Sequence, residues 1–171
     1  MKMQKIVLVA VVCLTFAVSF VNSALAGLWG SSEGETEKIA VTFAKEVARG
    51  GYQIVTAEDL KKMMDEKKDM LIIDTMPFEA SFKKNHIPGA VNFELPVPEM
   101  TSMDDATKVK FEKLLGPNKE RILVFYCGFT KCTRSHNGAM WAVKLGYKNV
   151  YRQPGGIKAW IEAKYPVEEA K

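Results

Sequence analysis

A short segment with two cysteines contains the residue types in this chain that are best suited to covalent chemistry. It reads Cys127-Gly-Phe-Thr-Lys-Cys-Thr-Arg-Ser135 and directly follows the apolar run 122–126. That run is β-branched and aromatic, which predicts a buried strand, and the helical pattern beginning near Arg134 predicts a helix after the loop. Cys127 is therefore expected where a strand ends and a helix begins. Open α/β sheets bind ligands at this edge, and helix N-termini favour anions.

Cys127 is predicted to ionise easily and to act as a nucleophile, because the thiolate is the reactive form and positive surroundings favour it. Inward-facing N–H groups of the loop would form a cradle for an anionic sulfur, with Gly128 giving the backbone room to turn. Positive side chains nearby would attract an anionic substrate. The alternative is a buried, inert thiol. The candidate substrate-binding residues are Gly128, Lys131, Arg134 and Ser135.

Cys132 is predicted to be a redox partner of Cys127, since the two thiols are close in sequence on a loop that contains glycine. A reversible disulfide between them would switch off the Cys127 thiolate. The alternative is a thiol without a role, or a loop whose geometry keeps the two sulfurs apart. His136 adds a third potential ligand, but three ligands from one loop fall short of a closed zinc site. We therefore expect neither a metal nor an organic cofactor.

Two further residues are expected to support the site. Asp74 follows the apolar run 70–73 and so lies at the end of another strand. It could hold neighbouring loops through hydrogen bonds or touch the substrate. His86 stands beside Ile87-Pro88 in a predicted turn, where a hydrogen-bonded structural role is favoured over a catalytic base.

The elements that must position these residues alternate between short strands and helices, which predicts a parallel sheet covered on both faces. In the helix predicted at 104–115, Val109 is expected on the apolar face, and in the last helix Ile161 is expected in the core beside Trp160. Strands are predicted at 52–55, 70–73, 91–93, 122–126 and 149–152, and helices from about 35, 56, 77, 104, 134 and 155.

Residues 1–26 have the order of a secretory signal peptide, with two lysines, a 16-residue uncharged run and small residues before Gly27. An uncleaved anchor is the alternative. Residues 27–51 are predicted to form a linker and an amphipathic helix that ends at Gly50-Gly51, and that docks on the domain or contacts a membrane or partner. Cleavage would lower the formal net charge from +4 to +2, a balance that predicts no nucleic-acid surface.

Residues 52–171 are predicted to form one domain, and over about residues 52–166 it resembles a single rhodanese-like (sulfurtransferase) domain. The resemblance rests on the strand ending at Asp74, the segment His86-Ile-Pro-Gly-Ala90, the sequence Val-Phe-Tyr-Cys127 with Arg134-Ser135 opening the next helix, and Gly155-Gly156 with Trp160. It implies a three-layer α/β fold, with a small parallel sheet between helices, and assigns Cys127 as the sulfur carrier. Two features depart from the family: the loop from Cys127 to Arg134 is longer, and Met76 stands where most members have arginine.

The resemblance implies a sulfurtransferase, and the predicted signal peptide places it in the periplasm or otherwise outside the cytoplasm. A small sulfur-containing anion would load Cys127 as a persulfide, and a thiol would accept the sulfur. An exported thiol reductase is an expected partner, whereas nucleic acid and stable membrane association after cleavage are not expected. Two alternatives use the same fold: a cysteine-dependent phosphatase or arsenate reductase with Arg134 on the oxyanion, and a non-catalytic binding module.

Overall fold

Five parallel strands form one sheet in the computed structural model, which describes residues 32–170. Their spatial order is β1-β5-β4-β2-β3, so β4 lies in the centre and Cys127 follows the central strand. This confirms the five predicted strands, with boundaries that differ by at most one residue at either end. The strands are β1 (Gln53–Ile54), β2 (Met70–Asp74), β3 (Val91–Asn92), β4 (Ile122–Tyr126) and β5 (Val150–Arg152).

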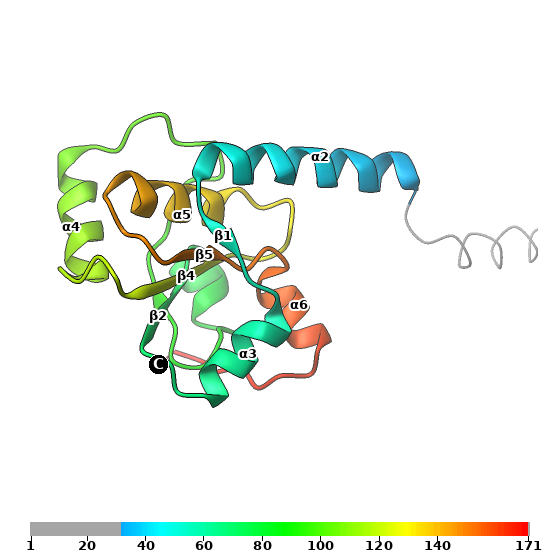
Figure 1. Cartoon of the computed structure of the whole chain (residues 1–171). Helices are drawn as coiled ribbons and strands as arrows, with labels where there is room; N and C mark the ends of the chain where they lie inside the picture. The colour runs from blue at the N-terminus through cyan, green and yellow to red at the C-terminus, as the bar shows by residue number, and fades with distance from the viewer. Residues whose placement is uncertain (1–31, 171) are drawn as a thin grey trace, which may run out of the picture. The chain divides into compact units, whose positions relative to one another are not determined.

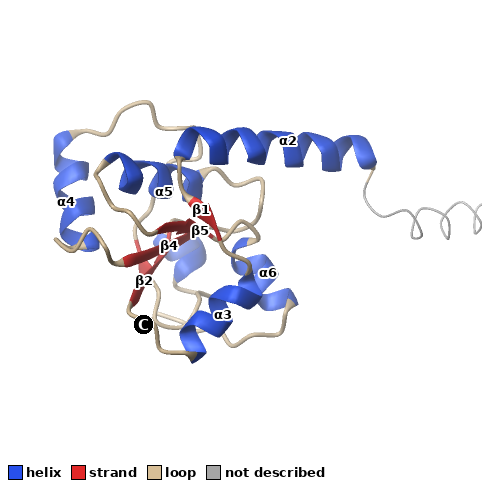
Figure 2. Ribbon diagram, in the orientation of Figure 1, coloured by secondary structure: helices blue, strands red, loops and turns tan. Residues whose placement is uncertain are grey.

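Helices cover both faces of this sheet, as predicted for a three-layer α/β fold. Helices α4 and α5 lie on one side of the strands and α3 and α6 on the other (Figures 1 and 2). Each predicted helical segment forms a helix, although one of them is a π-helical turn. They are α2 (Glu33–Gly50), α3 (Ala57–Asp65), η1 (Phe78–Phe82), α4 (Asp105–Leu115), α5 (Arg134–Lys144) and α6 (Gly156–Glu162).

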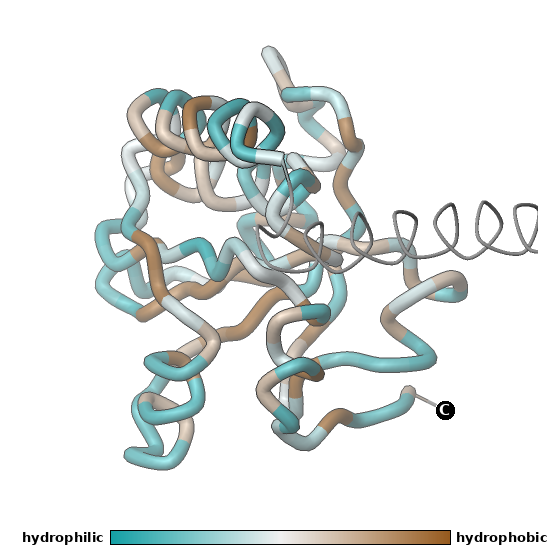
Figure 3. The backbone as a smooth tube through the Cα atoms, turned by 90° about the vertical axis from the view of Figure 1, so that its right-hand side faces the viewer, coloured by the Kyte–Doolittle hydropathy of each residue, from teal (hydrophilic) through white to brown (hydrophobic). Residues whose placement is uncertain are grey.

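Alternate residues of the central strands enter two separate hydrophobic cores. On β4, Leu123 and Phe125 pack with residues of α4 and α5, whereas Val124 and Tyr126 pack with Trp160 and Leu60 on the other face. Successive side chains of a strand point to opposite faces, so a strand buried on both sides must be apolar throughout. Figure 3 shows hydrophobic segments, in brown, in the middle of the backbone tube.

Three expectations are wrong in detail. Phe82 and Lys83 donate their N–H groups to carbonyls five residues earlier, so the predicted helix after Pro77 is a short π-helical turn. Val109 and Ile161, both expected to face the core, are 64% and 46% exposed. On α4 the buried residues are Phe111 and Leu115. Only the face of the helix with these two residues packs on the sheet, and Val109 lies outside it.

The N-terminal helix begins at Glu33, two residues before the predicted start, and ends as predicted, because Gly51 has the positive φ of 65° that terminates a helix. Residues 41–171 form one compact unit. In this unit, Val47 packs against the core of α4 and α5, which confirms docking for this end of α2. The predicted signal peptide lies outside the described residues. Among residues 32–170, no helix is long and apolar enough to cross a membrane.

Candidate active site

Cys127 lies directly after β4 and its residue is fully buried. Its Sγ is 3.1 Å from the backbone oxygen of Cys132, 3.7 Å from that of Phe129, and 3.3 Å from the hydroxyl oxygen of Ser135. The loop 127–133 therefore folds around the sulfur. Ser135, a predicted substrate-binding residue, is itself buried and reaches the sulfur from the first turn of α5.

The expectation that Cys127 ionises easily is wrong for this conformation. Burial raises the pKa of the Cys127 thiol, and the hydrogen bond that it gives to the Cys132 sulfur raises it further, against the opposing effect of Ser135. Backbone carbonyls near the sulfur favour the S–H form in the same way. The sequence indicated the position of the thiol but not the degree to which it is desolvated.

The anion cradle that the loop was predicted to form holds the sulfur of Cys132. That sulfur accepts hydrogen bonds from the Cys127 thiol and from the N–H groups of Gly128 and Arg134, and the Arg134 side chain adds a favourable charge. The bond from Cys127 is the largest cause that lowers the pKa of Cys132 to about 6. Both cysteines are free thiols. The hydrogen bond between the two sulfurs thus favours the proton on Cys127 and negative charge on Cys132.

The two predicted cationic residues differ in their surroundings. The Arg134 guanidinium donates to the backbone oxygen of Leu95 and is 3.7 Å from a carboxylate oxygen of Glu94. Lys131 is exposed. Arg134 is therefore close to Cys132 and is anchored to the segment that follows β3. Its role towards an anionic substrate stays a prediction.

Arg152 is a residue of the site that sequence reasoning missed. It ends β5, is fully buried, and donates to the backbone oxygens of Cys132 at 3.0 Å and Thr130 at 3.4 Å. The guanidinium also pairs with Glu46 of α2 at 2.5 Å and reaches the Tyr52 hydroxyl at 3.2 Å. A signal was present, because Arg152 ends a predicted strand at the same sheet edge as Asp74 and Cys127.

His136 is directed away from the two cysteines. Its Nδ1 is 2.9 Å from the Tyr52 hydroxyl and its Nε2 is 3.7 Å from Glu99, which also pairs with Arg49 of α2. Burial lowers the pKa of this imidazole. Within residues 32–170, no three potential ligands among His, Cys, Asp and Glu are grouped to hold a metal ion.

Asp74 and His86 both hold loops. Asp74 is buried at the end of β2 and accepts a hydrogen bond from the N–H group of Met76 at 2.8 Å. His86 Nδ1 is 2.9 Å from the backbone oxygen of Phe82, on whose ring the imidazole stacks at 4.0 Å. Both residues make hydrogen bonds of the kind expected for a structural role, and their roles in the site stay predictions.

The N-terminus of α6 contacts the backbone of the loop 127–133, which we call the active loop. The N–H groups of Ile157 and Lys158 donate to the backbone oxygens of Cys127 and Gly128, at 2.8 and 3.1 Å. Gly156, with a φ of 64°, lies so close that an added Cβ would be 2.2 Å from the Cys127 oxygen. The predicted Gly155-Gly156 pair thus allows a helix to touch the loop backbone.

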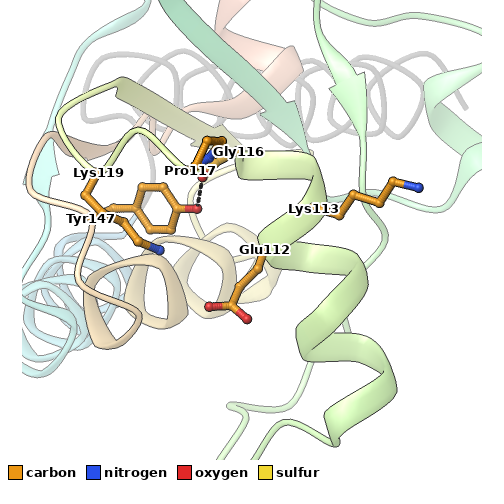
Figure 4. Close-up of a pocket in the computed structure, with 6 residues that line it drawn as sticks. All are labelled: Glu112, Lys113, Gly116, Pro117, Lys119 and Tyr147. Carbon is orange, nitrogen blue, oxygen red and sulfur yellow. Dashed lines mark hydrogen bonds between the residues drawn. The ribbon is translucent and has the colours of Figure 1, made fainter.

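A surface hollow of about 420 Å³ lies elsewhere, between the end of α4 and Tyr147 (Figure 4). The Tyr147 hydroxyl donates to the backbone oxygen of Gly116 there, and the Lys119 ammonium lies 3.8 Å from the centre of the tyrosine ring. These residues precede β4 and β5, so the hollow is at the opposite edge of the sheet from Cys127. It does not belong to the cysteine site.

Comparisons with known proteins agree with this arrangement. A family model described as a rhodanese-like domain matches residues 56–163. The mouse protein named thiosulfate sulfurtransferase/rhodanese-like domain-containing protein 3 is 28% identical over 120 residues, which cover 68% of this chain and 72% of that protein. Rhodanese-like domain-containing protein 14, chloroplastic, from Arabidopsis thaliana is 30% identical over 149 residues, covering 67% of this chain and 65% of its own.

Solved structures show the same fold. A thiosulfate sulfurtransferase from Pseudomonas aeruginosa has a TM-score of 0.58 and 21% identity, with a match that covers 76% of this chain and 22% of that one. The polysulfide-sulfur transferase homodimer from Wolinella succinogenes has a TM-score of 0.55 and 17% identity, with 84% of this chain and 94% of that chain covered.

Proposed function

We propose that this chain, which belongs to the rhodanese-like domain family, is a sulfurtransferase. In this proposal Cys127 carries the sulfane sulfur. The observation that carries the proposal is the place of Cys127, which follows the central strand and is enclosed by the loop 127–133. Its sulfur contacts a second cysteine of this loop and the Ser135 hydroxyl of α5. Relatives named thiosulfate sulfurtransferases support the same reaction class.

The proposed reaction has two half-reactions. In the first, the Cys127 proton moves to the Cys132 sulfur, the hydrogen-bonded acceptor, as the Cys127 sulfur attacks the outer sulfur of a thiosulfate-type donor. The S–S bond of the donor breaks and sulfite leaves with the electron pair. In the second, an acceptor thiolate attacks the outer sulfur of the Cys127 persulfide, and the Cys127 thiolate leaves. Lys131 and Arg134 supply positive charge for the anionic donor.

Mass spectrometry after incubation with thiosulfate tests this proposal directly. Trypsin cuts after Arg121 and Lys131, so Cys127 falls in the peptide 122–131 and Cys132 in the peptide 132–134. With thiols blocked by iodoacetamide before digestion, the proposal expects one added sulfur on peptide 122–131 and none in Cys127→Ser. Sulfur on peptide 132–134 alone, or phosphate-ester hydrolysis without sulfur loading, would contradict it.

Arg134→Ala tests the role of the loop's positive charge. We expect turnover with thiosulfate to fall roughly tenfold to a thousandfold, the range for loss of one charge-stabilising group, with the fold intact. Arg121→Ala is a suitable control, because Arg121 pairs with Asp69 at the other end of β4. Equal turnover in the Arg134 variant and the control would remove Arg134 from the site.

A further inference from the structure

We propose that Arg152 is a positioning residue for Cys127, acting through the Ser135 hydroxyl and the backbone oxygen of Cys132. The inference rests on the proposed function, in which the Cys127 sulfur must bear negative charge as a thiolate and then as a persulfide. It gives a role to a fully buried arginine that the two half-reactions do not otherwise use.

The first route is the direction of the Ser135 hydroxyl. Arg152 Nε is 3.0 Å from Ser135 Oγ, and a guanidinium can only donate, so the serine oxygen accepts this hydrogen bond. The other partner of that oxygen is Cys127 Sγ at 3.3 Å. Arg152 occupies one lone pair of that oxygen, and a Cys127 sulfur that has lost its proton can only accept, so the hydroxyl hydrogen then points at the sulfur. Arg152 thus makes Ser135 a donor that stabilises an anionic Cys127.

The second route is the backbone oxygen of Cys132. This oxygen lies 3.1 Å from Cys127 Sγ, where its partial negative charge opposes a thiolate. Arg152 Nη2 donates to the same oxygen at 3.0 Å and to that of Thr130 at 3.4 Å. The guanidinium therefore reduces the negative potential at the sulfur and fixes the loop backbone around it.

Glu46 stabilises the buried guanidinium of Arg152. A buried guanidinium without a partner is strongly destabilising, and the carboxylate of Glu46, itself 7% exposed, lies 2.5 Å from Arg152 Nη1. The ring of Phe43 covers the guanidinium at 5.0 Å. The last turns of α2 are thus part of the support of the active loop.

The test measures the apparent pKa of Cys127 from the pH dependence of its alkylation by iodoacetamide, read on the tryptic peptide 122–131. This measurement uses no sulfur donor, so its outcome is separate from the test of sulfur transfer. Arg152→Lys keeps a charge for Glu46 but replaces a planar fork with one ammonium, which cannot reach all partners. The titratable groups around the cluster are unchanged in every variant: Glu46 of α2, Tyr52, Cys132 of the loop and His136 of α5.

Ser135→Ala is expected to raise the apparent pKa of Cys127 by about 1 pH unit, the effect of losing one hydrogen bond to a charged group. Arg152→Lys should raise it at least as much, because it weakens both routes. Ser135→Ala should add little in the Arg152→Lys background, because Arg152 orients the hydroxyl that Ser135→Ala removes. Arg121→Lys, an arginine outside the site that keeps its trypsin cleavage point, should change nothing. Fully additive shifts, or an unchanged pKa in Arg152→Lys, would overturn the proposal.

Ser135→Thr provides the rescue, since it keeps a hydroxyl at the same position and should retain most of the parental pKa. Circular dichroism and thermal unfolding show whether each variant folds. If Arg152→Lys does not fold, Ser135→Ala provides the test. The proposal requires the pKa of Cys127 to rise in this variant. A pKa that is unchanged or lower would refute a hydroxyl directed at the sulfur.

Discussion

At the scale of single residues, burial determines how Asp74 titrates. Removal from water raises the pKa of its carboxyl group from 3.8 to about 6, against the N–H group of Met76 and the hydroxyl of Tyr126, which lower it. The folded protein therefore binds this proton more tightly than the unfolded chain. The resulting contribution to the free energy of unfolding is present below about pH 4 and is lost as the pH rises through 6. Its upper bound is roughly 3 kcal/mol.

Asp74→Asn should remove this pH dependence while keeping an oxygen that can accept from Met76. We expect the variant to be more stable than the parent at pH 8 and similar to it near pH 4, in urea unfolding followed at both values. Asp69→Asn is the matched control, because the Asp69 side chain is 83% exposed. If the free energies of unfolding of the parent and Asp74→Asn differ by the same amount at pH 4 and pH 8, Asp74 does not titrate as a buried group.

The two thiols of the loop predict a redox switch. They are hydrogen-bonded to each other, and attack by the Cys132 thiolate on the inner sulfur of a Cys127 persulfide would form a disulfide and release sulfide. Mild oxidant should link the tryptic peptides 122–131 and 132–134 and stop sulfur loading, and a dithiol should restore both. Cys132→Ala should lose this oxidant sensitivity. Continued transfer under oxidant with two free thiols would leave Cys132 without a redox role.

At the scale of elements, the start of α6 fixes the backbone of the active loop. Gly156→Ala forces a Cβ to within 2.2 Å of the Cys127 oxygen and 2.5 Å of the Gly128 carbonyl carbon. The loop must move, so sulfur loading should fall at least tenfold, and the clash should add roughly 1–3 kcal/mol to the cost of positive φ.

Gly146→Ala separates the clash from the backbone strain. Gly146 has a φ of 89° after α5, but no heavy atom lies within 4 Å of its added Cβ. This variant should lose about 1–2 kcal/mol of stability, as alanine does at positive φ, and keep its sulfur loading. Thermal unfolding and loading measured on both variants check the prediction, and equal activity in the two would show that α6 does not position the loop.

At the scale of the whole molecule, the N-terminal segment predicts where the protein works. Residues 1–26 have the order of charge, apolar run and small residues that signal peptidase requires. The exported protein should begin at Gly27, as determined by N-terminal sequencing of extracytoplasmic material. A chain that begins at Met1 and is recovered with membranes would indicate an uncleaved anchor instead.

The sequence by itself determined the order of the helices and strands and the position of the candidate reactive cysteine. Short apolar runs separated by helical periods predicted β2, β4 and the helices between them, because these patterns reflect which faces must be buried. Cys127 at the end of β4 and the glycine stop of α2 follow from the same local rules. Even the wrong assignments, Val109 and Ile161, lie in correctly predicted helices; periodicity indicates a face but not whether a partner covers it.

Only the tertiary structure decided how the site is charged. The order of the two thiol pKa values depends on how deeply each sulfur is buried and on which N–H groups point at it, and neither is encoded in their spacing. Arg152 and Glu46 are 106 residues apart in the chain, yet their pairing holds the Arg152 guanidinium against the backbone of the loop. Desolvation and charge pairing act through space at a few ångströms, so they become readable only when distant segments have been brought together.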